Sequence, residues 1–144
     1  MREVRTEIEI AATDDTVWGL LTNIENWTAW NPTINASSGT AAPGATLSIT
    51  MRGQGGKNGP KYAPVVTILE APRQFRWRAN MMGGLLFRND KILELQPSAT
   101  GTRLVHTETF GGLMVPMFGA KLKTGVPPIL NAFNAAVKQR AEAG

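Results

Sequence analysis

The feature that most constrains the fold of this chain is a series of segments in which apolar and polar residues alternate. A period of two residues is typical of strands with one buried face. The segments are separated by short stretches rich in Gly, Pro and Ser, which favour turns between antiparallel neighbours. We expect a loop at residues 53–60 and seven strands, at residues 5–11, 33–38, 46–52, 61–71, 74–81, 85–96 and 102–110.

Two short helices are expected directly after the first strand. Thr13 can accept a hydrogen bond from the first helical turn, and the acidic residues that follow it suit the positive end of the helix dipole. This helix is expected to end near Asn23. A second, brief helix then begins at Ile24 and ends before Pro32, because a proline disfavours helical backbone at the preceding residue.

The pattern changes to helical spacing after Gly112, where apolar residues recur every three or four positions. Residues 124–128 include two consecutive prolines, which cannot both occupy a helix interior without loss of backbone hydrogen bonds. We therefore expect a break that separates a mobile gate at residues 113–123 from a docked helix at residues 128–143.

The composition indicates one globular domain that covers residues 1–144. The chain has no cysteine, which excludes disulfides, Cys-ligated metals and thiol catalysis. Its one histidine, His106, has none of the spacings that assemble a zinc site. We expect neither a metal nor a bound cofactor.

Charge and hydropathy limit the partners that this chain can have. The formal net charge of +4 comes without a clustered basic stripe, so nucleic acid is not an expected partner. The chain has no apolar run long enough to cross a membrane, although transient contact with a membrane surface stays open. The amino end does not resemble a secretory signal, so a cytoplasmic location is expected, as a monomer or a homodimer.

A turn over residues 98–101 sets the register of the last two strands, because partners across an antiparallel hairpin have a constant sum of residue numbers. This turn pairs Lys91 with Glu108 and Leu93 with His106. All four side chains then lie on the same face of the sheet, so polar groups stand among apolar ones.

A turn centred on Gly83 similarly pairs Trp77 with Asn89 and Phe75 with Lys91. The inward face is then mostly apolar with a few polar groups, which is typical of a small-molecule pocket. Methionines near its ends can adapt to varied ligand shapes. The expected ligand-binding residues are Trp30, Met51, Trp77, Phe87, Asn89, Lys91, His106, Glu108, Phe110 and Met117.

Each polar candidate also has a purely structural interpretation. Lys91 and Glu108 could form a cross-strand ion pair of small energetic weight. His106 could be a core ring with satisfied hydrogen bonds, which we favour over acid–base chemistry. The catalytic candidates, if there is catalysis, are His106, Glu108 and Lys91. On the outward face, Arg78 and Arg88 are more typical of a solvated sheet surface than of a site for an anionic partner.

Five short motifs, which together span nearly the whole chain, resemble the START-like (SRPBCC) superfamily. They are Val17-Trp18, Trp27-Thr-Ala-Trp30-Asn31-Pro32, Gly39 with Pro43-Gly44, Glu70-Ala-Pro72 with Phe75-Arg-Trp77, and His106-Thr-Glu108-Thr-Phe110-Gly111. The polyketide cyclase/dehydrase and lipid-transport group within it is the most similar. The resemblance implies an α+β helix-grip fold, in which a curved seven-stranded antiparallel sheet and a long carboxy-terminal helix enclose a cavity.

The resemblance and the expected pocket together predict a protein that binds a hydrophobic or amphipathic small molecule, such as a lipid or a polyketide. One alternative is a polyketide cyclase or aromatase-like enzyme that uses His106 and Glu108 for proton transfer. A second alternative is a protein-interaction domain of the chaperone-activator type, which would need an exposed apolar patch around residues 113–118.

Overall fold

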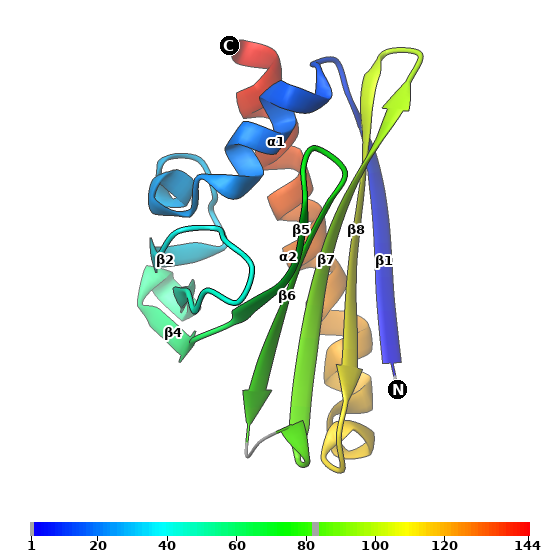
Figure 1. The fold of residues 1–144 in the computed structure, drawn as a ribbon. Helices are drawn as coiled ribbons and strands as arrows, with labels where there is room; N and C mark the ends of the chain where they lie inside the picture. The colour runs from blue at the N-terminus through cyan, green and yellow to red at the C-terminus, as the bar shows by residue number, and fades with distance from the viewer. Residues whose placement is uncertain (1, 82–83) are drawn as a thin grey trace.

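The computed structural model describes residues 2–81 and 84–144 and has an α+β fold with two antiparallel sheets and a long carboxy-terminal helix (Figure 1). Five strands form the larger sheet in the order β1-β8-β7-β6-β5, and three form the smaller sheet in the order β2-β3-β4. The strands of the larger sheet are β1 (Arg2–Ile10), β5 (Val65–Glu70), β6 (Gln74–Met81), β7 (Phe87–Ser98) and β8 (Gly101–Gly111). Those of the smaller sheet are β2 (Ile34–Ser38), β3 (Ser48–Arg52) and β4 (Asn58–Tyr62).

The expected single seven-stranded sheet is wrong, because the segment 61–71 forms two strands in two different sheets. Pro64 separates β4 from β5, since proline has no N–H for a sheet ladder. Its carbonyl instead accepts a hydrogen bond from the backbone N–H of Leu47, at 2.8 Å. The expected loop at residues 53–60 contains a 3-10 turn, η2 (Gln54–Gly56), and the start of β4, an edge strand that tolerates Pro60.

Both short helices expected after the first strand are present. α1 (Asp14–Thr22) begins at Thr13, whose side chain accepts a hydrogen bond from the backbone N–H of Thr16 at 3.3 Å. η1 (Ile24–Ala29) follows directly as a 3-10 helix. The capping residue Thr13 and the helix-ending effect of Pro32 were therefore enough to predict both helices from the local sequence.

The expected break in the carboxy-terminal helix is wrong, because α2 (Val115–Ala143) continues through Pro127 and Pro128. The two prolines cannot donate to the carbonyls of Lys123 and Thr124, four residues earlier. Both of those residues are exposed, so water can bond their carbonyls instead. The segment that the sequence suggested as a gate has no break at which to move.

The two central hairpins show where register can be predicted. β7 and β8 pair as expected, with Lys91 opposite Glu108. Between β6 and β7 the expected register is wrong by two residues, because Trp77 lies opposite Lys91 rather than Asn89. Residues 84–86 belong to the connection, which is therefore longer than expected, and the predicted turn centre at Gly83 lies outside the described residues. A shift of two residues leaves every side chain on its predicted face.

The core lies between the larger sheet, α1, η1 and the second half of α2. Leu130, Phe133 and Val137 of α2 are buried at spacings of three and four residues, as expected for one face of a helix. The largest fully buried side chains are Trp27, Trp77, Phe75, Phe133, Ile10, Leu21, Ile24, Leu47, Ile49, Leu93, Leu95 and Leu104. This packing fixes α2 against the sheet (Figure 1). A cavity remains against the middle of the helix, at Val126, Ile129, Leu130 and Phe133.

On the outer face of the larger sheet, Asp90 binds two arginines. Its carboxylate is 2.5 Å from the guanidinium of Arg76 and 2.7 Å from that of Arg78. Burial raises the pKa of Asp90, but hydrogen bonds from both guanidinium groups outweigh it, so the pKa is lowered overall. Arg78 is therefore engaged within the sheet, and it lies opposite Asp90 rather than opposite Arg88 as the sequence suggested.

Candidate functional site

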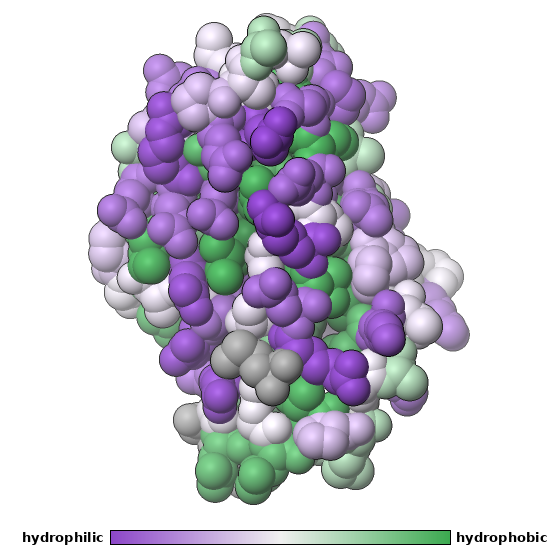
Figure 2. All heavy atoms as spheres, turned by 90° about the vertical axis from the view of Figure 1, so that its right-hand side faces the viewer, coloured by the Kyte–Doolittle hydropathy of each residue, from purple (hydrophilic) through white to green (hydrophobic). Residues whose placement is uncertain are grey.

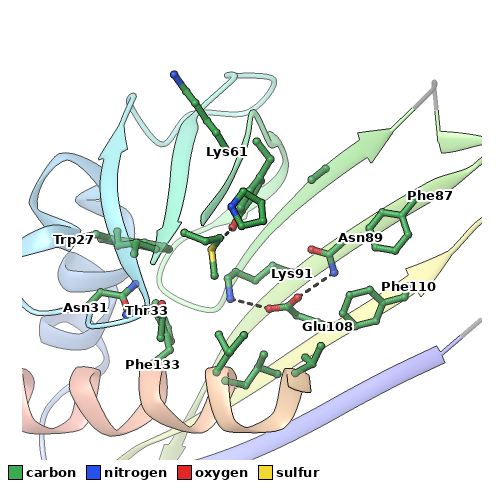
Figure 3. A pocket seen from close by; sticks show the side chains of 18 of the residues that line it. Trp27, Asn31, Thr33, Lys61, Phe87, Asn89, Lys91, Glu108, Phe110 and Phe133 are labelled. Atoms are coloured by element: carbon green, nitrogen blue, oxygen red, sulfur yellow. Dashed lines mark hydrogen bonds and ion pairs between the residues drawn. The ribbon is translucent and has the colours of Figure 1, made fainter. Parts of the chain in front are cut away.

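A cavity of about 410 Å³ lies between the two sheets and α2 (Figure 3). β3, β4, β6, β7, β8 and α2 all contribute to its wall, which is mostly apolar. The lining residues are Trp27, Asn31, Thr33, Ile34, Met51, Pro60, Lys61, Tyr62, Ala79, Asn80, Phe87, Asn89, Lys91, Glu108, Phe110, Val126, Ile129, Leu130 and Phe133. An apolar chamber with few polar groups is the usual form of a small-molecule site.

Lys91 is the central polar group of this cavity. Its Nζ lies 3.1 Å from Oε2 of Glu108 and 2.6 Å from Nε2 of His106. The ammonium also lies 4.9 Å from the ring centroid of Phe133 and 5.8 Å from that of Trp77, distances at which a cation is attracted to an aromatic face. Lys91 thus has two polar partners and two aromatic neighbours.

His106 belongs to a chain of hydrogen bonds behind the cavity wall. The side chain of Thr6 donates to the carbonyl of His106 at 2.9 Å, so its oxygen can accept a bond from Nδ2 of Asn134, at 2.8 Å. This arrangement turns Oδ1 of Asn134 toward Nδ1 of His106, 2.9 Å away. Nδ1 therefore carries the proton, and Nε2 is left to accept a hydrogen bond from Lys91.

Burial lowers the pKa of both basic groups of this cluster, His106 and Lys91. It lowers the pKa of His106 well below its usual value, and the nearby ammonium of Lys91 lowers it further. Burial also lowers the pKa of Lys91, although Glu108 opposes that change. The phenol of Tyr62, on the opposite side of the cavity, has a raised pKa because of burial and the negative charge of Glu108. His106 and Tyr62 are therefore neutral near pH 7.

This burial predicts an acid sensitivity of folding that originates at His106. The unfolded chain binds a proton at this residue below about pH 6.5, whereas the folded chain does not. The free energy of unfolding should therefore fall with decreasing pH, by at most about 1.4 kcal/mol per pH unit. Urea denaturation between about pH 7 and about pH 5 measures this slope. His106→Gln should remove it, and an unchanged slope in that variant would contradict the assignment.

Asn89 fixes the second polar side chain of the cavity. Its Nδ2 donates to Oε1 of Glu108 at 3.0 Å and to the carbonyl of Thr109 at 3.3 Å (Figure 3). Glu108 therefore has one carboxylate oxygen bonded to Asn89 and the other to Lys91. This geometry holds the carboxylate against the wall.

Asn31 lines the cavity and has a buried hydrogen-bond donor that the described residues leave unused. Its Oδ1 accepts from the backbone N–H of Thr33 at 2.9 Å and from the hydroxyl of Thr33 at 2.6 Å, which leaves Nδ2 as the free end of the amide. That Nδ2 is buried, and no group in the described residues accepts its protons. A buried donor without a partner costs on the order of 1–3 kcal/mol, so a ligand acceptor that reached Nδ2 would be stabilising.

Six of the ten predicted ligand-binding residues line the cavity, namely Met51, Phe87, Asn89, Lys91, Glu108 and Phe110. The other four do not line the cavity, for two reasons. Trp30, Trp77 and His106 lie behind the wall, packed around Phe133 and Trp27. Met117 is 76% exposed, on the first turn of α2. The role of the six in binding remains a prediction.

Sequence reasoning missed several residues of the cavity wall. Trp27 and Asn31 lie in a motif that carried the family resemblance, and Phe133 has the helical spacing of a core residue, but neither signal indicates exposure to a cavity. Tyr62 is the one tyrosine of the chain, and its hydroxyl lies 3.6 Å from Sδ of Met51. Only the packing of β4 against β3 brings these two side chains together.

The described residues form neither a metal cluster nor a helix that could span a membrane. In residues 2–81 and 84–144, His, Asp and Glu side chains do not gather in any group of three that could hold a metal ion. Across the same residues, no helix is both long and apolar enough to cross a membrane.

Comparisons with solved structures show the fold. The di-domain ARO/CYC StfQ of the steffimycin biosynthetic pathway is 15% identical, with a TM-score of 0.77 over 98% of this chain and 51% of StfQ. This chain thus spans about half of StfQ. The AHSA1-like protein of Aeromonas hydrophila is 16% identical, with a TM-score of 0.72 over 99% of this chain and 93% of its own. The protein TTHA0849 of Thermus thermophilus is 21% identical, with a TM-score of 0.74 over 99% of this chain and 98% of its own.

Comparison at the level of sequence identifies the family. No curated protein sequence matches the chain significantly. The model of the family described as polyketide cyclase / dehydrase and lipid transport, however, matches residues 1–142. That match agrees with the fold, with the similarity to StfQ and with the apolar cavity under α2. The chain therefore belongs to the polyketide cyclase/dehydrase and lipid-transport family of the SRPBCC fold.

Proposed function

We propose that the protein binds a neutral, hydrophobic small molecule that carries at least one acceptor oxygen, such as a ketone carbonyl. The apolar wall would hold the hydrocarbon part of the ligand. Membership of a family that includes lipid transport and polyketide cyclases supports a ligand of this kind. The more specific proposal, a neutral ligand with an acceptor oxygen, rests on the polar groups of the cavity wall.

The observation that carries this proposal is the presence of donors without acceptors in an apolar cavity. Nδ2 of Asn31 has no partner in the described chain. The ammonium of Lys91 has three N–H groups and two polar partners in the described residues, His106 and Glu108, so one N–H group has no oxygen or nitrogen acceptor. A carbonyl oxygen of a ligand would satisfy either donor and remove an energetic cost.

The charges around Lys91 favour a neutral ligand over an anion. Glu108 balances the ammonium of Lys91 within the wall. A ligand carboxylate next to Lys91 would therefore also lie near Glu108 and be repelled. Lys61, the other cation of the lining, points away from the cavity (Figure 3). An anionic ligand would thus lose its hydration on entering the cavity, and no cation that lacks a carboxylate partner would face it there.

A second candidate function is enzymatic, as in the ARO/CYC protein StfQ. The contact between Lys91 and His106 favours it, because a proton could pass from the cavity through Lys91 to Nε2. His106 itself does not line the cavity, so it would act through Lys91. Glu108 is the carboxylate that could touch a substrate directly. We favour binding because both carboxylate oxygens of Glu108 are already bonded.

Displacement of the neutral dye Nile red by three ligands of equal chain length tests the proposal. Methyl nonyl ketone should bind about fivefold more tightly than undecane, since one hydrogen bond contributes about 1 kcal/mol. Undecanoate should bind more weakly than the ketone because it must bury a charge. Failure of all three to displace the dye would contradict binding, and tightest binding of undecanoate would contradict the ligand class.

The same protein incubated with a linear β-triketone separates a binder from a cyclase. Our account expects the triketone to be recovered unchanged by mass spectrometry. Loss of water from the triketone in the wild type, reduced by a factor of about 10² to 10⁴ in His106→Gln, would establish the enzymatic candidate instead.

A further inference from the structure

We propose that one end of the molecule docks on an anionic lipid bilayer. The docking surface is an apolar tip made of Leu85, after β6, and Leu113 and Met117, at the junction of β8 with α2. The inference goes beyond the binding of a ligand in the cavity and does not depend on it. It is carried by exposure, by the construction of the tip and by the charges around it.

The tip gathers side chains that proteins normally bury. Leu85 is 68% exposed, Leu113 69% and Met117 76%. In the described part of the chain they are three of only five large hydrophobic residues that are exposed, and they are the three most exposed of them. Figure 2 shows hydrophobic side chains together at the end of the molecule where β8 leads into α2. Such a patch, unlike scattered exposed residues, marks an interaction surface.

The two turns of the tip are fixed to each other by backbone hydrogen bonds. The N–H of Leu113 donates to the carbonyl of Leu85 at 3.0 Å, and that of Met114 donates to the carbonyl of Leu86 at 2.9 Å. Gly112 has a φ of 109°, and a Cβ at this position would lie 2.5 Å from the carbonyl oxygen of Leu86. The glycine therefore permits the close approach, and the exposed side chains project from an ordered base.

Four cations surround the tip without a carboxylate partner in the described residues. Of the eleven other lysines and arginines, seven form ion pairs with carboxylates, and four, namely Arg52, Lys57, Lys61 and Arg140, do not do so within the described chain. The four are Arg2, Arg88, Lys121 and Lys123.

The positions of these cations follow from the local structure. Lys121 is one helical turn beyond Met117, and so on the same face of α2. The guanidinium of Arg2 lies against Gly119, where a Cβ would be 2.6 Å from its nitrogen. The guanidinium of Arg88 lies equally close to Gly111. Lys123 lines a surface hollow together with Arg2 and Glu3. The four cations thus lie beside the apolar tip and form a rim whose charge is positive overall, with Glu3 as the carboxylate of that hollow.

The charge pattern selects an anionic bilayer as the occupant. Residues 109–141, which include the start of α2, contain no Asp or Glu. Apolar side chains inside a cationic rim can enter the boundary of the acyl chains while the cations bind acidic headgroups. A second copy of this chain would bring a second set of the same cations to the contact, which repel each other.

The residues of the tip lie close in the chain to residues that line the cavity. Phe87 and Phe110 line the cavity, with ring centroids 6.1 Å apart. Leu85 lies two residues before Phe87 in the chain, and Leu113 lies three residues after Phe110. A bilayer bound at the tip would therefore meet the end of the molecule from which the strands of the cavity wall emerge.

Co-sedimentation with vesicles tests the proposal. We expect binding to vesicles of phosphatidylcholine with phosphatidylglycerol, and binding at least tenfold weaker to phosphatidylcholine alone, since each cation near an anionic surface contributes about a fivefold change. Lys121→Gln with Lys123→Gln should weaken binding by roughly twentyfold. Leu85→Ser with Leu113→Ser should weaken it by at least about tenfold.

Matched variants elsewhere on the surface control for charge and hydropathy in general. Lys57→Gln removes an exposed lysine from the end of η2, and Val65→Ser removes an apolar residue that is 39% exposed on β5. Both should keep wild-type vesicle binding. Equal losses in these controls, no binding by the wild type, or equal binding to both vesicle types would overturn the proposal. The proposal would also be overturned if the protein dimerised without vesicles and the two Leu→Ser changes abolished that dimer.

Nile red uptake by the same variants without vesicles separates this proposal from the proposed function. The Leu85→Ser and Leu113→Ser pair should still take up the dye, since neither residue lines the cavity. Vesicle binding without dye uptake by the wild type would contradict the cavity ligand and leave the docking surface supported.

Discussion

Lys91→Met is expected to lower the free energy of unfolding by about 3 kcal/mol, near the lower end of the effect of breaking a buried ion pair. Methionine keeps an unbranched apolar stem like that of lysine but lacks the terminal nitrogen, so it cannot donate to Glu108 or His106. The side chains of Lys91 and Glu108 are 11% and 13% exposed, so little solvent can stabilise the carboxylate that remains. Chemical denaturation at about pH 7 measures the loss.

A double variant shows whether the loss comes from the unpaired carboxylate. Lys91→Met combined with Glu108→Gln removes both charges, and the amide oxygen of Gln can still accept the hydrogen bond from Asn89. Most of the lost stability should return, because replacing both partners of a buried pair is far less costly than removing one. A double variant as unstable as Lys91→Met would contradict this account of the site.

The polar centre of the cavity could be predicted because it depends on one short hairpin. The turn between β7 and β8 determines the register, which places Lys91 opposite Glu108 and Leu93 opposite His106. Alternation then sends all of these side chains to one face. Register and face are local properties, so no knowledge of the rest of the fold was needed.

The walls around that centre could not be predicted, because they depend on contacts between distant segments. Asn134 reaches His106 from a helix 28 residues later in the chain. The division of the expected strand at Pro64 places Tyr62 in a separate sheet that closes one side of the cavity. The uninterrupted course of α2 through its two prolines sets which residues of the helix face inward. None of these features has a signature in local spacing.

Trp77, one of the aromatic residues expected to contact a ligand, does not line the cavity. Trp77 is on the inward face of β6, as expected, but it is only 1% exposed because Phe75, Trp27 and Tyr62 pack around its ring. The alternation of apolar and polar residues identifies which side chains of a strand face inward. Whether a residue on that face meets a neighbour or a cavity depends on how the layers fill space.

Ala79→Trp is expected to abolish ligand binding, with a loss of affinity of at least about a hundredfold. Ala79 lines the cavity from β6, opposite Asn89. An indole ring at this position would occupy space that the ligand needs. Because the ring enters a void rather than a packed core, the change in stability should be smaller than the roughly 1–3 kcal/mol of ordinary overpacking.

Ala135→Trp is the matched control for this substitution. Ala135 is exposed on α2 and does not line the cavity, so this variant adds the same ring outside the site. It should bind methyl nonyl ketone as the wild type does. Equal losses of affinity in the two variants would show that the ring acts through a general effect on the fold.

The most direct test of the central claim is the methyl spectrum of protein labelled with ¹³C at its methionine methyl groups, recorded during titration with methyl nonyl ketone. Met51 lines the cavity, whereas Met117 is 76% exposed at the apolar tip. We expect the Met51 signal to shift in the wild type and in Ala135→Trp, to stay fixed in Ala79→Trp, and the Met117 signal to stay fixed in all three. A ketone that leaves Met51 unchanged in the wild type would contradict binding in this cavity.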